Sequence, residues 1–184
     1  QSALLESMQE QQVTIGDQTF VLDQPFLVMA TQNPIEQEGT YPLPEAQVDR
    51  FLFKVIVTYG TMEQEVEMMR RMARGAEPEA EVAADREKIL RWKAHADQCF
   101  VSDRLRDYIV KLVFASRQPA EFGLRDFENA VAIGASPRAS LNLERAAAVH
   151  ALVRGRGYAT PEDVKAIGVD VLRHRIALSY EAEA

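Results

Sequence analysis

The spacing of the apolar residues changes near residue 60, and this change most constrains how the chain can fold. Before Gly60, apolar residues form short runs between turn-forming residues, as in short strands. After Gly60 they recur every three or four residues, which places them on one face of a helix. Charge changes there too: residues 1–60 hold 8 acidic and 2 basic groups (net −6), and residues 61–184 hold 20 and 19 (net −1). We therefore predict two domains, residues 1–60 and 61–184.

The first region is predicted to be a small α/β unit. A short helix over residues 3–8 is followed by a β-hairpin, residues 13–15 and 18–22, around the turn at Gly16. Residues 26–30 form an uninterrupted apolar run, the pattern of a strand buried on both faces of a parallel sheet. A short helix near residues 45–49 and a second strand over residues 51–57 complete the region.

The second region is predicted to be an all-α bundle, which makes the whole chain predominantly helical. Apolar stripes over residues 62–73 and 101–113 are expected to pack into a core, with another helix over residues 85–97 and a linker over residues 75–84. Ser136-Pro137 and Thr160-Pro161 each place a good N-cap before a proline at the first helical position. These pairs predict helices that run to about residues 153 and 172.

Composition excludes several classes of function. The net charge of −7 argues against a general binder of nucleic acid or of anionic membranes, and no apolar run approaches the roughly 18 residues of a membrane helix. The single cysteine, Cys99, rules out an internal disulfide framework, and the three histidines show no zinc-ligand spacing. His150 and His174 have no Asp or Cys constellation around them that would suggest nucleophilic catalysis or metal binding. We expect a protein of a reducing compartment, the cytoplasm, without membrane insertion.

Asn33 is the first candidate functional residue. It follows the apolar run of residues 26–30 within Ala30-Thr31-Gln32-Asn33-Pro34, at the strand edge where ligands bind in open α/β sheets. A neutral amide there can hold a phosphate oxygen or orient an attacking water. The alternative is that Asn33 only forms a turn before proline.

Two arginines are the other candidates. Arg50 follows an acidic helix, and its planar guanidinium suits the γ-phosphate of a nucleotide on a neighbouring subunit. The alternative is a local ion pair with Asp49 or Glu45. Arg138 lies in the first turn of a helix, where a cation is unfavourable unless an anion is bound nearby. The alternative is an acidic neighbour such as Glu144 or a solvent-facing side chain.

Together and in this order, these segments resemble the MoxR family of AAA+ ATPases. Asn33 in ATQNP, Arg50 in PEAQVDRF and Arg138 in GASPRAS are similar to the sensor 1, arginine-finger and sensor 2 motifs. The string NPIEQEGTYPLPEAQVDRF is nearly identical to the family's sequence in this segment, and the resemblance covers the whole chain. It implies that residues 1–60 are the end of an AAA+ P-loop core and that residues 61–184 are the helical lid domain.

The resemblance also implies an activity. The complete protein would be an ATP-driven ring, commonly a hexamer, that uses ATP and Mg²⁺ and acts as a chaperone in assembling protein complexes, often with von Willebrand factor A domain partners. Asn33 would orient the attacking water, Arg50 would reach the neighbour's nucleotide, and Arg138 would contact phosphate in cis or in trans. The hairpin over residues 13–22 would face the central pore.

One departure from the family pattern limits what this chain can do alone. The sequence contains no G-x-x-x-x-G-K-[ST] motif and no apolar strand ending in Asp-Glu, the parts that hold triphosphate and magnesium. We expect a truncated part of a longer protein that does not hydrolyse ATP by itself. A magnesium-chelatase-type ATPase subunit and a non-catalytic helical interaction module are the alternative hypotheses.

Overall fold

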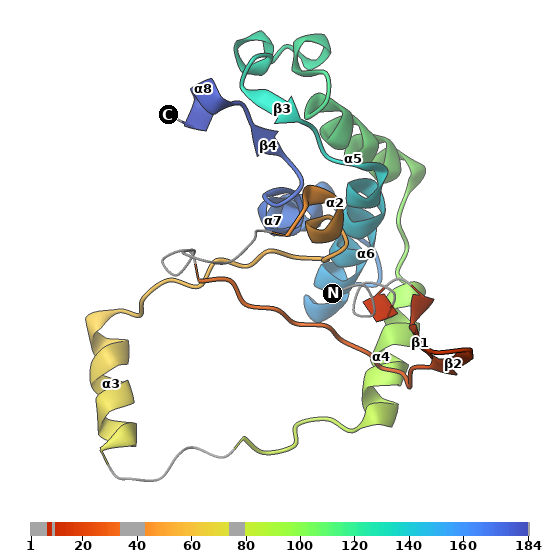
Figure 1. Ribbon diagram of the computed structural model, residues 1–184, viewed down its shortest axis with the longest axis vertical. Coiled ribbons are helices and arrows are strands. Elements are labelled where there is room, and N and C mark those ends of the chain that lie inside the picture. Colours follow the sequence, from red (N-terminus) through yellow and green to blue (C-terminus); the bar gives the residue numbers. More distant parts are fainter. Residues whose placement is uncertain (1–6, 9, 34–42, 74–79, 184) are drawn as a thin grey trace.

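The structure is a computed structural model that describes residues 7–8, 10–33, 43–73 and 80–183. Within these residues the chain is mostly helical, with two small antiparallel strand pairs. Figure 1 shows a helical body of α5 (Asp103–Ala115), α6 (Pro137–Val153) and α7 (Pro161–Leu172), while α3 (Met62–Met72) stands apart from it. Most of the predicted helix at residues 3–8, the loop at 34–42 and much of the predicted linker lie outside the described residues.

The core lies between three helices, α5 (Asp103–Ala115), α6 (Pro137–Val153) and α7 (Pro161–Leu172). The apolar stripe predicted over residues 101–113 is buried as expected. Several core positions of α6 are alanines, whose small side chains let α5 and α7 approach its backbone closely. The buried apolar residues are Val101, Leu105, Ile109, Val113, Ala135, Ala139, Leu143, Ala146, Ala147, Ala148, Ala151, Val164 and Val171.

The predicted helix starts at residues 136 and 160 are confirmed. Ser136 is the N-cap of α6, and its hydroxyl accepts a 3.2 Å hydrogen bond from the backbone N–H of Arg138. Thr160 caps α7 in a reciprocal capping box with Asp163. In both helices a proline follows the cap, where its missing N–H costs nothing.

Asp163 also holds the end of α6 to α7. Its carboxylate is 1% exposed and lies 2.6 Å from both Arg156 Nη2 and His150 Nδ1. The hydrogen bond from Arg156, opposed by burial and aided by His150 and Thr160, keeps the pKa of Asp163 well below its usual range. The sequence showed no catalytic or metal-binding constellation around His150, and the structure gives it this acidic partner 13 residues away.

The predicted hairpin is confirmed as β1 (Gln12–Ile15) paired antiparallel with β2 (Gln18–Val21). Gly16, in the turn, has a φ of 62°, a conformation that favours glycine. A second pair, β3 (Val131–Ile133) with β4 (Ala177–Leu178), was not predicted, because strands of two and three residues leave no recognisable periodicity. The chain then ends in α8 (Tyr180–Glu183), and two 3₁₀ turns, η1 (Pro119–Phe122) and η2 (Arg125–Phe127), precede β3.

The two strands predicted over residues 26–30 and 51–57 do not form. Both segments are extended but unpaired within the described chain, and Leu27 is 79% exposed and Val57 is 90% exposed. A strand needs a neighbouring backbone to complete its hydrogen bonds, and no other described strand lies beside them. The apolar side chains of these two segments are therefore not buried within the described chain.

The prediction that the stripe over residues 62–73 is core is also wrong for this structure. The stripe lies on α3 (Met62–Met72), which buries none of its residues and stands apart from the helical body in Figure 1. Between α3 and α5, α4 (Arg86–Asp97) has no fully buried residue either. Among the described residues no helix is long and apolar enough to cross a membrane.

Candidate functional site

Arg50 follows a single helical turn and is held in place from both sides. The turn is α2 (Glu45–Val48), confirmed near the predicted position, and Asp49 is its C-cap. The backbone N–H groups of Asp49 and Arg50 bond back to the carbonyls of Glu45 and Gln47, at 2.9 and 3.3 Å. The local geometry thus fixes where the Arg50 side chain leaves the backbone.

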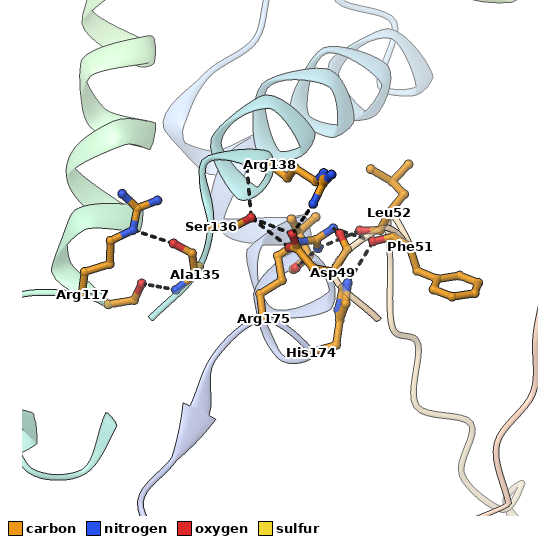
Figure 2. Close-up of polar contacts among 11 residues, drawn as sticks. Asp49, Phe51, Leu52, Arg117, Ala135, Ser136, Arg138, His174 and Arg175 are labelled. Atoms are coloured by element: carbon orange, nitrogen blue, oxygen red, sulfur yellow. Dashed lines mark hydrogen bonds and ion pairs between the residues drawn. The ribbon is translucent and has the colours of Figure 1, made fainter. Parts of the chain in front are cut away.

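Arg175, just beyond α7, binds this segment from the other side (Figure 2). Its side chain is fully buried, and its Nε donates to Asp49 Oδ1 at 3.0 Å. Its Nη2 donates to the Asp49 carbonyl at 2.9 Å and also to the Phe51 carbonyl. Its Nη1 donates to the Leu52 carbonyl at 3.3 Å. Arg50 therefore lies within a stretch whose neighbouring carbonyls are all bound by one guanidinium.

Asp49 connects Arg50's segment to Arg138. Its carboxylate accepts a 2.8 Å hydrogen bond from the Ser136 hydroxyl and a 3.2 Å hydrogen bond from Arg138 Nη1. Partial burial raises the pKa of the Asp49 carboxyl, but these bonds and the charge of Arg175 outweigh it and lower the pKa below 3.8. The acidic neighbour of Arg138 is therefore Asp49, not Glu144, which pairs with Arg106.

His174 completes the attachment of this segment. Its Nε2 lies 2.9 Å from the Phe51 carbonyl and donates to it. Burial lowers the pKa of the imidazole below 6.5, and although the bond to Phe51 opposes this, the nearby Arg175 reinforces it. A neutral histidine with the proton on Nε2 satisfies this geometry.

Arg50 and Arg138 line the same pocket, of about 330 Å³. Arg50 Nε is buried and makes no hydrogen bond within the described structure, so its N–H is an unsatisfied donor. Arg50 forms neither of the local ion pairs considered from the sequence. The lining residues are Met8, Glu10, Arg50, Arg138, Leu141, Asn142 and Arg145.

Asn33 lies elsewhere. It is exposed, at the end of the extended segment that includes residues 26–30, and is not among the residues that line the pocket. The structure thus brings two of the three predicted residues together and leaves the third outside. Among the described residues no cluster of acidic, histidine or cysteine side chains could hold a metal ion, so we assign no Mg²⁺ ligand to them.

Sequence reasoning missed the residues that position the two arginines. Arg173-His174-Arg175 is visible as a basic run, but His174 was set aside because no acidic partner stands near it in the sequence. The contact between His174 and Phe51 spans 123 residues. Asp49 was considered only as a partner of Arg50, because adjacent charges suggest a local pair.

Comparison with known proteins gives this arrangement a context. The family model described as the ATPase family associated with various cellular activities (AAA) matches residues 1–53, and that of the AAA lid domain matches residues 125–184. A crystal structure described as that of a candidate ATPase from Cytophaga hutchinsonii superposes with a TM-score of 0.93 and 50% sequence identity. It covers 99% of this chain, which covers 56% of that chain. The chain is thus a segment of the AAA+ fold that includes its lid domain.

Two curated relatives refine the assignment. Chaperone MoxR1 of Mycobacterium tuberculosis is 53% identical over 100% of this chain and 48% of its own length. The uncharacterized protein YeaC of Bacillus subtilis is 39% identical over 100% of this chain and 55% of its own length. The chain belongs to the MoxR family of AAA+ ATPases, and it spans about half the length of the curated relatives it matches.

Proposed function

We propose that Arg50 and Arg138 together bind the phosphates of a nucleotide held by an adjacent subunit of an ATPase ring. The observation that carries this proposal is their shared pocket, and the buried Nε of Arg50 also has no hydrogen-bond partner in the described structure. Planar guanidinium groups bind phosphate oxygens in pairs and stabilise the charge that develops during phosphoryl transfer. If Arg50 acts as an arginine finger on the nucleotide of the adjacent subunit, the shared pocket supports the assignment of Arg138 to that same nucleotide.

Arg138 is already ion-paired with Asp49, so binding a phosphate oxygen requires it to exchange this contact. Its side chain is 47% exposed, so it can exchange the 3.2 Å contact for a phosphate oxygen at little cost. The N-terminus of α6, where it lies, is itself favourable for an anion. Asp49 keeps its charge throughout, because Ser136 and Arg175 continue to stabilise it.

Asn33 would serve a different nucleotide. Because it is outside the pocket, we assign it to the nucleotide of its own subunit, where its amide orients the attacking water with respect to the γ-phosphate. The sequence has no Walker A or Walker B motif, so the groups that hold triphosphate and Mg²⁺ would come from the remainder of a longer protein. The 184-residue chain alone would not hydrolyse ATP.

The wider assignments extend the family relationship. Residues 1–60 would be the end of the nucleotide-binding core, with the β1–β2 hairpin facing the pore, and residues 61–184 the lid. The complete protein would form a cytoplasmic ring, commonly a hexamer, that matures or assembles protein complexes with von Willebrand factor A domain partners. The name of Chaperone MoxR1, at 53% identity, supports the chaperone role.

The test uses the complete protein with its nucleotide-binding half. Arg50→Ala is expected to abolish steady-state ATP hydrolysis, because the transition-state charge loses its stabilising cation, and to leave ATP affinity largely intact. Arg154→Ala is the matched control, since Arg154 is exposed and lies outside the pocket. Full turnover by the Arg50 variant would contradict the assignment.

The alternative hypothesis, a non-catalytic interaction module, predicts that client binding does not depend on nucleotide. In that case residues 61–184 alone would retain a client protein with the same affinity whether or not nucleotide is present. Loss of client binding without ATP in the complete protein supports the ATP-driven chaperone instead.

A further inference from the structure

We propose that Arg145 and Asn142 extend the pocket into a site for a polyphosphate chain, so that α6 contacts more than one phosphate group of the bound nucleotide. This inference rests on the proposed function of Arg50 and Arg138. It adds two residues of α6 to which the sequence analysis assigned no role.

One face of α6 lines the pocket. Arg138, Leu141, Asn142 and Arg145 all line it and recur at helical spacing, so one face of α6 forms a continuous wall. Seven residues separate the two arginines, which corresponds to about 10 Å along a helix axis. A single carboxylate or phosphate group can meet both cations only if the two side chains bend toward one another. An extended anion with several charges fits this spacing.

The residues that line the pocket carry more positive than negative charge. Three arginines line the pocket, and Glu10 is the acidic residue among its described lining. Of the three, Arg138 is paired with Asp49, whereas Arg145 forms no ion pair or hydrogen bond with any described residue. The Nε of Arg50 is buried and unpartnered in the same part of the structure. Asp49 pairs with Arg138 and Glu10 is the one acidic residue in the described lining, so positive charge remains in excess and favours an anion in the pocket.

The chemistry of the wall selects phosphate over the side chains of an acidic peptide. A polyphosphate places many acceptor oxygens within a short distance, which suits planar guanidinium groups at both ends and the amide N–H of Asn142 between them. Carboxylates on a peptide are separated by backbone and carry one charge each. An acidic peptide is therefore the competing occupant that the experiment must exclude.

The experiment measures anion binding to the 184-residue chain, which contains the whole core of α5, α6 and α7. Tripolyphosphate and orthophosphate are titrated by calorimetry at fixed ionic strength into wild type and variants whose circular dichroism is unchanged. We expect Arg145→Gln to weaken tripolyphosphate binding by about tenfold to a hundredfold and to leave orthophosphate binding unchanged. Arg138→Gln should weaken both. Arg154→Gln removes the same charge from the C-cap of the same helix, outside the pocket, and should change neither.

The outcomes separate this inference from the proposed function. If Arg145→Gln behaves like Arg154→Gln while Arg50→Gln and Arg138→Gln lose tripolyphosphate, the extended site is wrong and the two-arginine proposal stands. If neither Arg50→Gln nor Arg138→Gln changes binding, the proposed function is contradicted as well. Tighter binding of a glutamate-rich peptide of equal charge, or no binding of tripolyphosphate by wild type, also overturns the extended site.

Discussion

At the scale of single residues, Arg175 connects the pocket to the helical body. Its fully buried guanidinium binds the Asp49 side chain and the carbonyls on either side of Arg50. A buried charge is tolerated only when it is paired and fully hydrogen-bonded, and Arg175 meets this condition through the backbone as well as through Asp49. The direction of Arg50 is therefore set by a residue of the lid as well as by the local turn of α2.

His174 makes the stability of this attachment depend on pH. Its pKa is lowered in the folded state by burial, so below pH 6.5 the unfolded chain takes up a proton more readily than the folded chain. We expect the free energy of unfolding to fall as the pH drops through 6.5 and to level off below the folded pKa. Denaturant titrations over this range measure the slope.

His174→Gln provides the matched comparison, because the glutamine Nε2 can still donate to the Phe51 carbonyl but does not titrate. The variant should lose the slope near pH 6.5. It should keep the separate loss of stability below pH 3.8, where the Asp49 carboxyl is protonated in the unfolded chain while its lowered pKa keeps it ionised in the folded chain. An unchanged slope in the variant would assign the pH dependence to other groups.

Single residues were predictable when their chemistry was unusual for their position. Arg138 was identified because a cation in the first turn of a helix requires an anion, and the structure supplies Asp49. Arg175 and Asp49 were not identified as a pair, because they lie 126 residues apart and neither is unusual where it stands. Long-range contacts of this kind leave no local signal in one sequence.

At the scale of elements, the approach of β3 and α6 to the end of α5 depends on Gly134. A Cβ at this position would lie 2.5 Å from the Ser116 carbonyl oxygen and 2.8 Å from Arg117 Cα, both backbone atoms. We expect Gly134→Ala to lower the free energy of unfolding by about 1–3 kcal/mol, because the backbone must shift to relieve the overlap. Thermal and denaturant unfolding measure this change.

Gly157→Ala is the control for Gly134. A Cβ on Gly157 meets no atom within 4 Å, and its φ is outside the left-handed region, so the substitution should be close to neutral. Equal stability of the two variants would show that the loop before α6 moves freely and does not position Ser136 and Arg138.

Elements were predicted well where local chemistry determines them. The caps at Ser136 and Thr160 act within a few residues, so the starts of α6 and α7 could be placed from the sequence. The strands at residues 26–30 and 51–57 failed because a strand also needs a partner, and the described chain offers none. The stripe on α3 failed for the same reason: periodicity indicates an apolar face but not what covers it.

At the scale of the whole molecule, Arg50 and Arg138 line one pocket, and Asn33 is exposed and is not among its lining residues. In a ring, a face that carries both arginines would meet one neighbour, and Asn33 would remain with its own nucleotide. The sequence alone left Arg138 able to act in cis or in trans. The shared pocket favours the arrangement in which both arginines serve the same nucleotide.

Mixed rings of the complete protein test this arrangement. Subunits carrying Arg50→Ala and subunits carrying Arg138→Ala are unfolded, mixed and reassembled, and ATP hydrolysis is measured. If both arginines serve the same neighbouring nucleotide, every subunit presents one defective arginine to its neighbour, so each site lacks one cation and the mixture stays as inactive as either variant. If Arg138 serves its own nucleotide, some sites receive Arg50 from one subunit and Arg138 from the other, and activity returns. Mixing either variant with wild type must restore partial activity, which shows that the subunits exchange, so recovered hydrolysis in the variant mixture contradicts the shared pocket.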